Sequence, residues 1–238
     1  MVVNKPRGMA SHPAPGSRTG TLVQVLRQRY AELGFPERHV AVVSRLDKGT
    51  SGLVLVVTDR SAHPGLHWQV IARRIGREYR CLVWGRPLFE ETVVDVPIGR
   101  RWDDSRRMHA YDLPPAQAAR WGARAARTCL KMLERFPQMA LLSAKLETGR
   151  MHQIRVHCQF IRLPIVGDPV YGGGTGDPDN MSEFGGIEIN GVCLHAGALT
   201  FHHPLTGELL SFDAPIEPPF STLLDALRCG GSPMRACH

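Results

Sequence analysis

Short apolar segments separated by polar turns recur along the chain, and most of them have the character of β-strands. They are rich in branched and aromatic residues and are bounded by turn-forming residues, which is typical of strands buried in a sheet. The predicted strands are residues 1–4, 40–43, 53–57, 79–84, 93–98, 128–135, 139–146, 193–201 and 208–212. The last two are expected to pair as a hairpin.

Apolar residues at helical spacing occupy several of the segments between these strands. One helix is predicted to begin after Thr21, a suitable N-cap, because Leu22 and Leu26 fall on one face. Further helices are predicted over residues 61–75, 151–161 and 218–227.

Two longer segments fit neither pattern. Residues 100–127 are basic and irregular, and residues 172–191 form a Gly-rich loop. No internal repeat and no linker marks a domain boundary. We therefore expect one domain over residues 1–228, followed by a flexible tail at 229–238.

The balance of charge favours an anionic partner. The 238-residue chain has 29 Lys and Arg against 22 Asp and Glu, a formal net charge of +7, and its 43% of hydrophobic residues is enough for a packed core. Nucleic acid is the first candidate partner. A basic surface that serves only solubility is the alternative.

Cysteine usage and hydropathy exclude several classes of protein. The six cysteines are scattered and include no CxxC pair, which excludes a zinc ribbon and a small disulfide framework. Reduced thiols suit a cytoplasmic protein. No apolar run approaches the roughly 18 residues of a membrane span, and the first residues lack the pattern of a signal peptide. We therefore expect a cytoplasmic protein without membrane attachment.

One acidic residue stands out in the connection between the predicted strands 40–43 and 53–57. Asp47 lies between two cations, Arg45 and Lys48, and a Thr-Ser-Gly turn follows. Neighbouring positive charge favours the ionised form of a carboxylate, so this is a suitable place for a nucleophile. An Asp that hydrogen-bonds its own turn is the alternative, and such a loop Asp has that role more commonly.

A second polar cluster lies in the predicted helix 151–161. On that helix Met151, Arg155 and Cys158 share one face, which presents Arg155 to apolar neighbours. A buried Arg requires a carboxylate partner, and we expect Asp47 to be that partner. The contact would fix the direction of the carboxylate oxygens. The alternative is an Arg that points to solvent.

No metal or nucleotide cofactor is expected. His63 and His67 have a suitable spacing but no acidic or Cys companion, and His152 and His157 point about 140° apart on a helix. No P-loop, GxGxxG or GxSxG motif is present. Any chemistry is therefore expected to run on side chains alone.

The irregular segment 100–127 combines arginines with aromatic residues. Its members are Arg100, Arg101, Arg106, Arg107, Arg120, Arg124 and Arg127, with Trp102, Tyr111 and Trp121. Cations among aromatic rings suit phosphates and stacked bases. A solvated insertion with a few buried rings is an equally good interpretation.

Four blocks follow one another in the order that one enzyme family has. They are Asn4-Lys5-Pro6-Arg7-Gly8, Arg45-Leu46-Asp47 with Thr50-Ser51-Gly52, residues 77–85 and residues 149–157. Residues 164–168, 194–196 and 203–208 extend the match over nearly the whole chain. With these blocks the chain resembles the RluA-type RNA pseudouridine synthases. Each motif alone is only a hypothesis, but the ordered set is specific.

The resemblance implies a cofactor-free enzyme that isomerises uridine to pseudouridine within RNA. The base is detached from the ribose, turned and rejoined through its C5 atom. By resemblance Asp47 is the nucleophile, Arg155 is its partner, and Tyr79 stacks on the base and helps to remove the C5 proton. Arg45 would fill the space that the flipped nucleotide leaves.

The same resemblance extends to substrate binding and to the fold. It implies that Arg45, Arg150, His152 and Gln153 bind the substrate. It also implies one mixed α/β domain, in which a mostly antiparallel central sheet with flanking helices carries Asp47 near its middle. Ribosomal or transfer RNA is the expected partner, no protein partner is evident, and we expect a monomer.

Three positions depart from the family pattern. Ser44 replaces a His, Arg77 replaces a Lys, and Met151 replaces a Thr or Ser. Because the four residues with implied roles in the reaction are all present, we expect these changes to affect substrate choice more than activity. The chain begins at the first block, without an S4-type RNA-binding domain, and either a natural or a truncated start explains this.

Two competing functions remain open at this level. One is a catalytically idle RNA-binding or RNA-folding protein on the same scaffold, which loss of the catalytic residues would have favoured. The other is a carboxylate-dependent hydrolase of a small substrate. The basic excess and the single candidate acid, Asp47, disfavour it.

Overall fold

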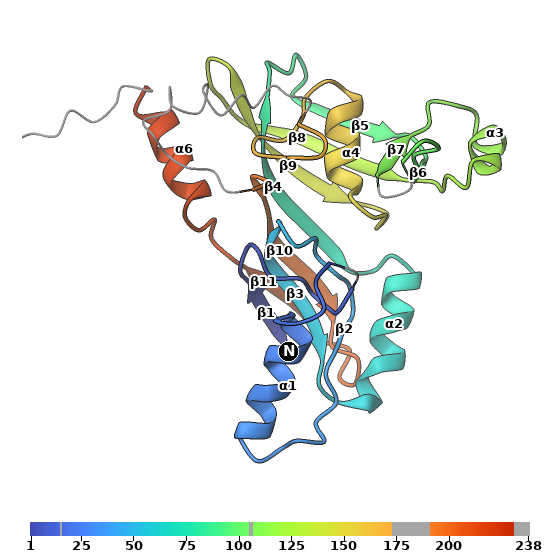
Figure 1. The fold of residues 1–238 in the computed structure, drawn as a ribbon, viewed down its shortest axis with the longest axis vertical. Helices are drawn as coiled ribbons and strands as arrows, with labels where there is room; N and C mark the ends of the chain where they lie inside the picture. Colours follow the sequence, from blue (N-terminus) through green and yellow to red (C-terminus); the bar gives the residue numbers. More distant parts are fainter. Residues whose placement is uncertain (15, 105–106, 173–190, 231–238) are drawn as a thin grey trace, which may run out of the picture. The chain divides into compact units, whose positions relative to one another are not determined.

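The computed structural model describes residues 1–14, 16–104, 107–172 and 191–230 (Figure 1). It divides into two compact units, each assembled from distant parts of the sequence. The first unit consists of Met1–Tyr79 and His195–Pro215, and the second of Arg80–Leu194 and Ile216–His238. Most of the predicted Gly-rich loop and of the predicted tail lies outside the described residues.

Strand β3 (Ser51–Val57) is central to the sheet of the first unit. β1 (Val2–Lys5) pairs antiparallel with β3, and β10 (Leu194–His202) pairs parallel with it. β2 (Ala41–Val42) pairs with the end of β3, and β11 (Leu209–Asp213) forms the predicted hairpin with β10. Because β3 is apolar at successive positions, it is buried along nearly its whole length.

Helices α1 (Leu22–Glu32) and α2 (His63–Ile71) belong to the same unit, and a short 3₁₀ turn, η1 (Arg60–Ala62), precedes α2. Alternate residues of β3 share one face of the strand and form a core with residues of α2 and β10. This core consists of Leu53, Leu55, Val57, Leu66, Ile75, Leu199 and Phe201. The first helix begins after Thr21, as predicted.

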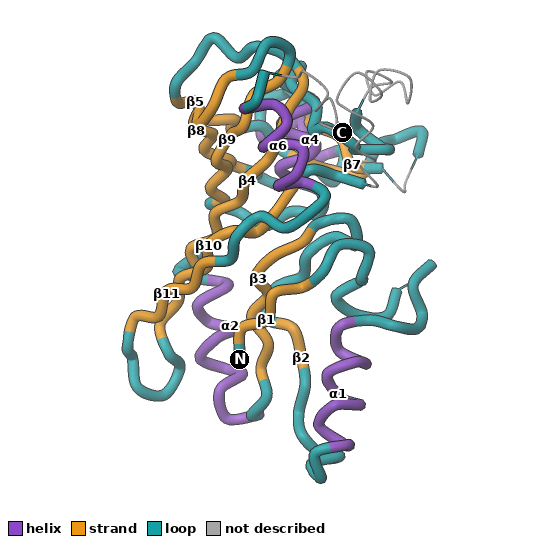
Figure 2. The backbone as a smooth tube through the Cα atoms, turned by 90° about the vertical axis from the view of Figure 1, so that its left-hand side faces the viewer, coloured by secondary structure: helices purple, strands orange, loops and turns teal. Residues whose placement is uncertain are grey.

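The second unit contains another run of paired strands, and Figure 2 traces its backbone. β4 (Gly76–Trp84) starts in the first unit and ends in this one, where β9 (Met139–Leu146), β8 (Arg127–Arg135) and β5 (Glu91–Asp95) follow in that order. β8 is antiparallel to both β9 and β5. The remaining elements are the strand pair β6 (Ile98–Arg100) and β7 (Met108–Ala110) and the helices α3 (Pro115–Arg120), α4 (Gln153–Phe160) and α6 (Phe220–Arg228).

The predicted fold class, mixed α/β with a mostly antiparallel sheet, is confirmed. The strand predicted over residues 93–98 is wrong, because β5 ends at Asp95 and β6 begins at Ile98 in a separate sheet. Pro97 lies at this break and has no N–H to donate to a ladder. The single domain over residues 1–228 stays a prediction. Within the described residues, no helix has the length and apolar character that a bilayer span requires.

Gly52 shows why the signature after Asp47 ends in a glycine. Its φ is +110°, and a Cβ built on it would lie 2.3 Å from the Ala196 carbonyl oxygen. The parallel pairing of β3 with β10 brings these two backbones together, since Gly52 is the register partner of Ala196. Only a residue without a side chain fits there.

Gly52→Ala is therefore expected to lower the free energy of unfolding by about 3 kcal/mol or more, because strained φ and overlap with backbone act together. Gly34→Ala is the matched control, since Gly34 has φ +86° with nothing within 4 Å of the added atom. It is expected to cost only about 1 kcal/mol. Urea denaturation of both variants measures the difference, and equal midpoints would contradict the argument.

Candidate active site

Asp47 lies in the loop between β2 and β3, and hydrogen bonds hold the backbone of this loop on both sides of it. The Thr50 N–H donates to the Asp47 carbonyl oxygen at 3.1 Å, and the Gly8 N–H donates to the Lys48 carbonyl oxygen at 2.9 Å. Asp47 is half-buried, whereas Arg45 is exposed. The loop therefore presents one partly shielded carboxylate next to a cation that reaches solvent.

Ser11 holds the residue before Asp47 through two hydrogen bonds. Its buried hydroxyl accepts from the Leu46 N–H at 3.0 Å and donates to the Leu46 carbonyl oxygen at 2.8 Å. Buried backbone groups need partners, and here one hydroxyl satisfies both. Because the Leu46 carbonyl belongs to the peptide that joins Leu46 to Asp47, Ser11 fixes the direction from which Asp47 leaves the backbone.

Lys5 is fully buried at the end of β1. Its Nζ donates to the carbonyl oxygens of Pro6, at 2.9 Å, and Met9, at 2.8 Å. Burial lowers the pKa of Lys5 to about 8, the Asp47 carboxylate opposes this by raising it, and Arg7 lowers it further. The Lys5 ammonium and the Asp47 carboxylate thus interact electrostatically in the first unit.

His195 fixes the other end of the loop, where β3 begins. It is fully buried, with Nδ1 2.9 Å from the Ser51 hydroxyl and Nε2 3.1 Å from the Ala214 carbonyl oxygen. A carbonyl only accepts, so Nε2 carries the proton and Nδ1 accepts from Ser51. The Thr-Ser-Gly turn after Asp47 is therefore anchored to β10 by Ser51 as well as by Gly52.

Tyr79 is 5% exposed on β4 and belongs to the same unit as Asp47. Burial raises the pKa of the Tyr79 phenol, Arg77 lowers it, and Asp47 raises it again, for a net upward shift. Tyr79 is therefore a neutral phenol near neutral pH, in electrostatic contact with Asp47.

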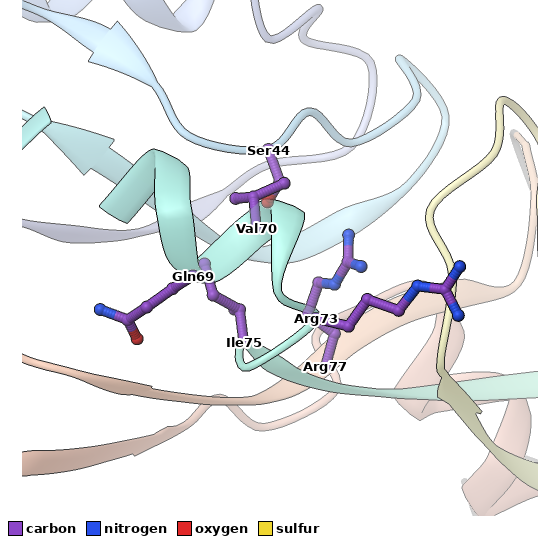
Figure 3. Close-up of a pocket in the computed structure, with 6 residues that line it drawn as sticks. All are labelled: Ser44, Gln69, Val70, Arg73, Ile75 and Arg77. Carbon is purple, nitrogen blue, oxygen red and sulfur yellow. The ribbon is translucent and has the colours of Figure 1, made fainter. Parts of the chain in front are cut away.

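A small recess of about 10 Å³ lies between α2 and β4, with room for about one water molecule. It is lined by Ser44, Gln69, Val70, Arg73, Ile75 and Arg77 (Figure 3). Buried Nε of Arg77 has no hydrogen-bond partner among the described residues. Arg77, which stands where the family has a Lys, therefore keeps a cation close to Tyr79, and its Nε–H can still donate a hydrogen bond.

Arg155 lies on α4 in the second unit and is 6% exposed, which confirms that it is buried. Its Nε donates to Asp168 Oδ2 at 2.7 Å and its Nη2 donates to Asp168 Oδ1 at 2.8 Å. The guanidinium also lies over the Tyr171 ring, 4.9 Å from the centroid. This is a bidentate buried ion pair with an aromatic face beneath it.

Asp168 is a partner for Arg155 that the sequence argument did not name. Burial raises the pKa of Asp168, but the hydrogen bonds and charge of Arg155 and the N–H groups of Tyr171 and Val170 lower it, and the net shift is downward. The predicted contact between Arg155 and Asp47 stays a prediction, because the two residues belong to different units.

Gln153 and His157 tie α4 to β8. The Gln153 amide donates to the Arg127 carbonyl oxygen and to Thr128 Oγ1, both at 3.0 Å, and its oxygen accepts from the Thr148 hydroxyl at 2.8 Å. His157 Nδ1 lies 2.8 Å from Thr128 Oγ1. Gln153 thus has a structural role here, and its binding of substrate stays a prediction.

His152 precedes α4 with φ of 57°, in the left-handed region. Its Nδ1 lies 2.9 Å from the Tyr171 hydroxyl, and the oxygen of that hydroxyl accepts from the Met108 N–H at 2.9 Å. Such a conformation costs a non-Gly residue about 1 kcal/mol or more and is often found at functional sites. Arg150 is half-buried, and its Nε donates to the Ala125 carbonyl oxygen at 2.9 Å.

Residues 1–160 match the family model described as RNA pseudouridylate synthase. The chain belongs to this family. The prediction of an RNA pseudouridine synthase, made from four ordered blocks, is confirmed at the level of the family.

Curated relatives of this pseudouridine synthase agree. The chain is 40% identical over 233 residues to the "Uncharacterized RNA pseudouridine synthase YlyB" of Bacillus subtilis, covering 97% of this chain and 71% of that protein. It is 38% identical to "Ribosomal large subunit pseudouridine synthase D" of Xanthomonas campestris, covering 96% of this chain and 66% of that protein. The chain thus spans about two thirds of the length of these relatives.

A solved human structure, "RNA Pseudouridylate Synthase Domain Containing 4", has the same fold. The TM-score is 0.76 at 24% identity, over 95% of this chain and 89% of the human one.

In this synthase the predicted site residues divide between the two units. Asp47, Arg45 and Tyr79 belong to the first, while Arg155 and the other predicted substrate contacts belong to the second. Sequence reasoning missed three residues that hold the candidate site: Ser11, His195 and Asp168. His195 and Asp168 lie in matched blocks, but their contacts are long-range, and no local pattern distinguishes Ser11 from other loop serines.

Proposed function

We propose that this pseudouridine synthase isomerises uridine in large-subunit ribosomal RNA, with Asp47 as the nucleophile. The observation that carries the proposal is the half-buried Asp47 carboxylate on a loop braced by Ser11 and Gly8, in electrostatic contact with neutral Tyr79. A nucleophile on a fixed backbone attacks from one direction, which reduces the entropy lost in reaching the transition state.

The reaction balances without a cofactor. The N1–C1′ bond of the uridine breaks, a C5–C1′ bond forms, C5 loses a proton and N1 gains one. Asp47 supplies the electron pair that starts the exchange. Because the pKa of Tyr79 is raised, its oxygen accepts the C5 proton only while its own proton passes on. The acceptor of that proton is the Asp47 carboxylate, which has recovered its electron pair and left the nucleoside by this step.

Access to the uridine requires that the nucleotide leave the stack. Arg45 is exposed two residues before Asp47, so its side chain is free to enter the space that the nucleotide vacates. The net charge of +7 supports binding of the RNA backbone. Arg150 and His152 are assigned the remaining contacts with the RNA. The Ala125 carbonyl oxygen accepts from Arg150, and Tyr171 contacts His152, whose backbone is in the left-handed region.

The target class follows from the relatives' names. Proteins called "Ribosomal large subunit pseudouridine synthase D" from Xanthomonas campestris and Pseudomonas aeruginosa are 38% and 36% identical to this chain. Tritium release from RNA labelled at uridine C5 tests the proposal, with large-subunit ribosomal RNA and transfer RNA transcripts compared side by side. Release from the ribosomal RNA alone is expected. Release only from transfer RNA would overturn the target class, and release from neither RNA, free or in assembling particles, would overturn the activity.

Ser11→Ala is expected to lower kcat by up to about a hundredfold with little change in KM, because the loop keeps its RNA contacts but loses the bonds that aim Asp47. Ser61→Ala is the control, since it removes an exposed hydroxyl that donates to Asp59 at 2.7 Å. Steady-state tritium release measures both variants. A loss in Ser11→Ala confined to KM would show that the residue serves binding instead.

A further inference from the structure

A second, larger recess lies in the first unit and is lined by residues of α2 and of the turn that joins β10 to β11. Its volume is about 230 Å³. It is lined by Gly65, Trp68, Gln69, Arg74, His202, His203 and Pro204. None of the catalytic candidates belongs to it, and no part of the proposed chemistry uses it.

The walls of this recess are held in place by partly buried hydrogen bonds. Gln69, 5% exposed, donates to the His202 carbonyl oxygen at 2.8 Å and accepts from the His202 N–H at 2.9 Å. Gly65 packs against Pro204, since a Cβ on Gly65 would lie 3.0 Å from the Pro204 Cβ. Because α2 is tied to the end of β10 in this way, the recess is preformed.

The surface of the recess combines one aromatic face with cationic and hydrogen-bond donors. Trp68 is 52% exposed, and the Arg74 guanidinium lies 4.7 Å from the centroid of its ring. His203 Nδ1 accepts from the Thr206 N–H at 3.2 Å, so its proton is on Nε2, which is a donor. No Asp or Glu is among the lining residues. Arg74 covers one face of the Trp68 ring, so a base would stack on the exposed remainder of the ring while the guanidinium binds its phosphate.

The larger recess adjoins the one beside the Asp47 loop. Gln69 lines both, and the smaller recess is also lined by Ser44, three residues before Asp47, and by Arg77 (Figure 3). Both recesses belong to the same unit as Asp47, so the proposed nucleophile and the ring of Trp68 are parts of one unit. The volume is below the roughly 300 Å³ of pockets that enclose whole small molecules, which favours part of a polymer over a free nucleotide.

We propose that the recess around Trp68 and Arg74 is a second RNA subsite, which stacks one base and binds one phosphate of the single strand flanking the target uridine. The inference rests on the proposed function for the identity of the polymer. It extends that function because it assigns to α2 and the β10–β11 turn a share of RNA binding outside the site of reaction.

Binding of a fluorescein-labelled oligouridylate of about 12 nucleotides to the full chain tests this subsite across a series of salt concentrations. Trp68→Ala is expected to raise Kd at least about fivefold with an unchanged salt slope, because stacking carries no net charge. Trp68→Phe is expected to retain most of the affinity. Arg74→Gln is expected to reduce the slope of log K against log salt by about 0.7, the value for one phosphate contact to single-stranded nucleic acid.

Arg38→Gln is the matched control. Arg38 also lies over an aromatic ring in the first unit, 5.8 Å from the centroid of Tyr30, but it lines neither recess. It is expected to leave both Kd and the slope unchanged. If Trp68→Ala and Arg74→Gln behave like Arg38→Gln, or if Arg74→Gln leaves the slope unaltered, the subsite is wrong. Tritium release by the wild type tests the proposed function separately, because oligouridylate binding needs no turnover.

Discussion

Asp47→Asn is expected to reduce tritium release to below about one-thousandth of the wild-type rate, a loss of at least about 4 kcal/mol of transition-state stabilisation. The amide occupies the same space and keeps one acceptor oxygen, but it lacks the negative charge that makes the carboxylate a nucleophile. Since Ser11 and Gly8 bond to the backbone of the loop and not to the Asp47 side chain, the loop is expected to keep its conformation.

Measuring RNA affinity shows whether Asp47→Asn is inactive because it lacks the nucleophile or because it is misfolded. Asp47→Asn is expected to bind oligouridylate at least as tightly as the wild type, because it removes a negative charge from a basic surface. Asp59→Asn is the matched control: this exposed Asp accepts from the Ser61 N–H at 2.8 Å outside the signature, and full activity is expected. Substantial turnover by Asp47→Asn would show that another group attacks the nucleoside.

Arg155→Ala is expected to lower the free energy of unfolding by about 3 to 5 kcal/mol, because it leaves the Asp168 carboxylate buried without its cation. The two side chains of this pair are 7% and 0% exposed, so water does not replace the missing partner. The cation over the Tyr171 ring is lost as well. Urea denaturation measures the effect.

Arg228→Ala is a matched control in the same unit. Arg228 also forms a two-armed ion pair, with Glu134 at 2.9 and 2.6 Å, but its side chains are 46% and 34% exposed. Solvent screens this pair, so a cost of at most about 1 kcal/mol is expected. Similar losses in the two variants would contradict the argument from burial.

The activity of Arg155→Ala tests the predicted contact between Arg155 and Asp47. Turnover is to be measured at a temperature at which the variant remains folded, with Arg155→Lys beside it, since Lys keeps the charge but not the planar fork. If Arg155 orients Asp47 as well as Asp168, kcat of both variants is expected to fall by more than the unfolded fraction of the protein explains. Near-normal kcat in folded Arg155→Ala would show that Arg155 stabilises the second unit and does not orient Asp47.

Local patterns predicted most of the elements and the chemistry of the Asp47 loop. Strand and helix periodicity act over neighbouring residues, so β3, β8, β9 and α4 follow from the sequence. Errors occurred at the ends of predicted elements. Pro97 lies at the break after β5, and the helix predicted over residues 61–75 is limited to the short turn η1 and α2, which ends at Ile71.

By itself the sequence determined the family and the ordered blocks, and it predicted the single candidate acid and the burial of Arg155. Only the tertiary structure decided which partners hold these residues. Ser11 meets Leu46 across 35 residues, and Ser51 meets His195 across 144. Such partners depend on which strands the sheet places side by side. The local sequence does not distinguish them, because other acids and hydroxyls in the chain have the same chemistry and similar neighbours. For that reason the tertiary structure, and not the sequence pattern, identified Asp168 as the partner of Arg155.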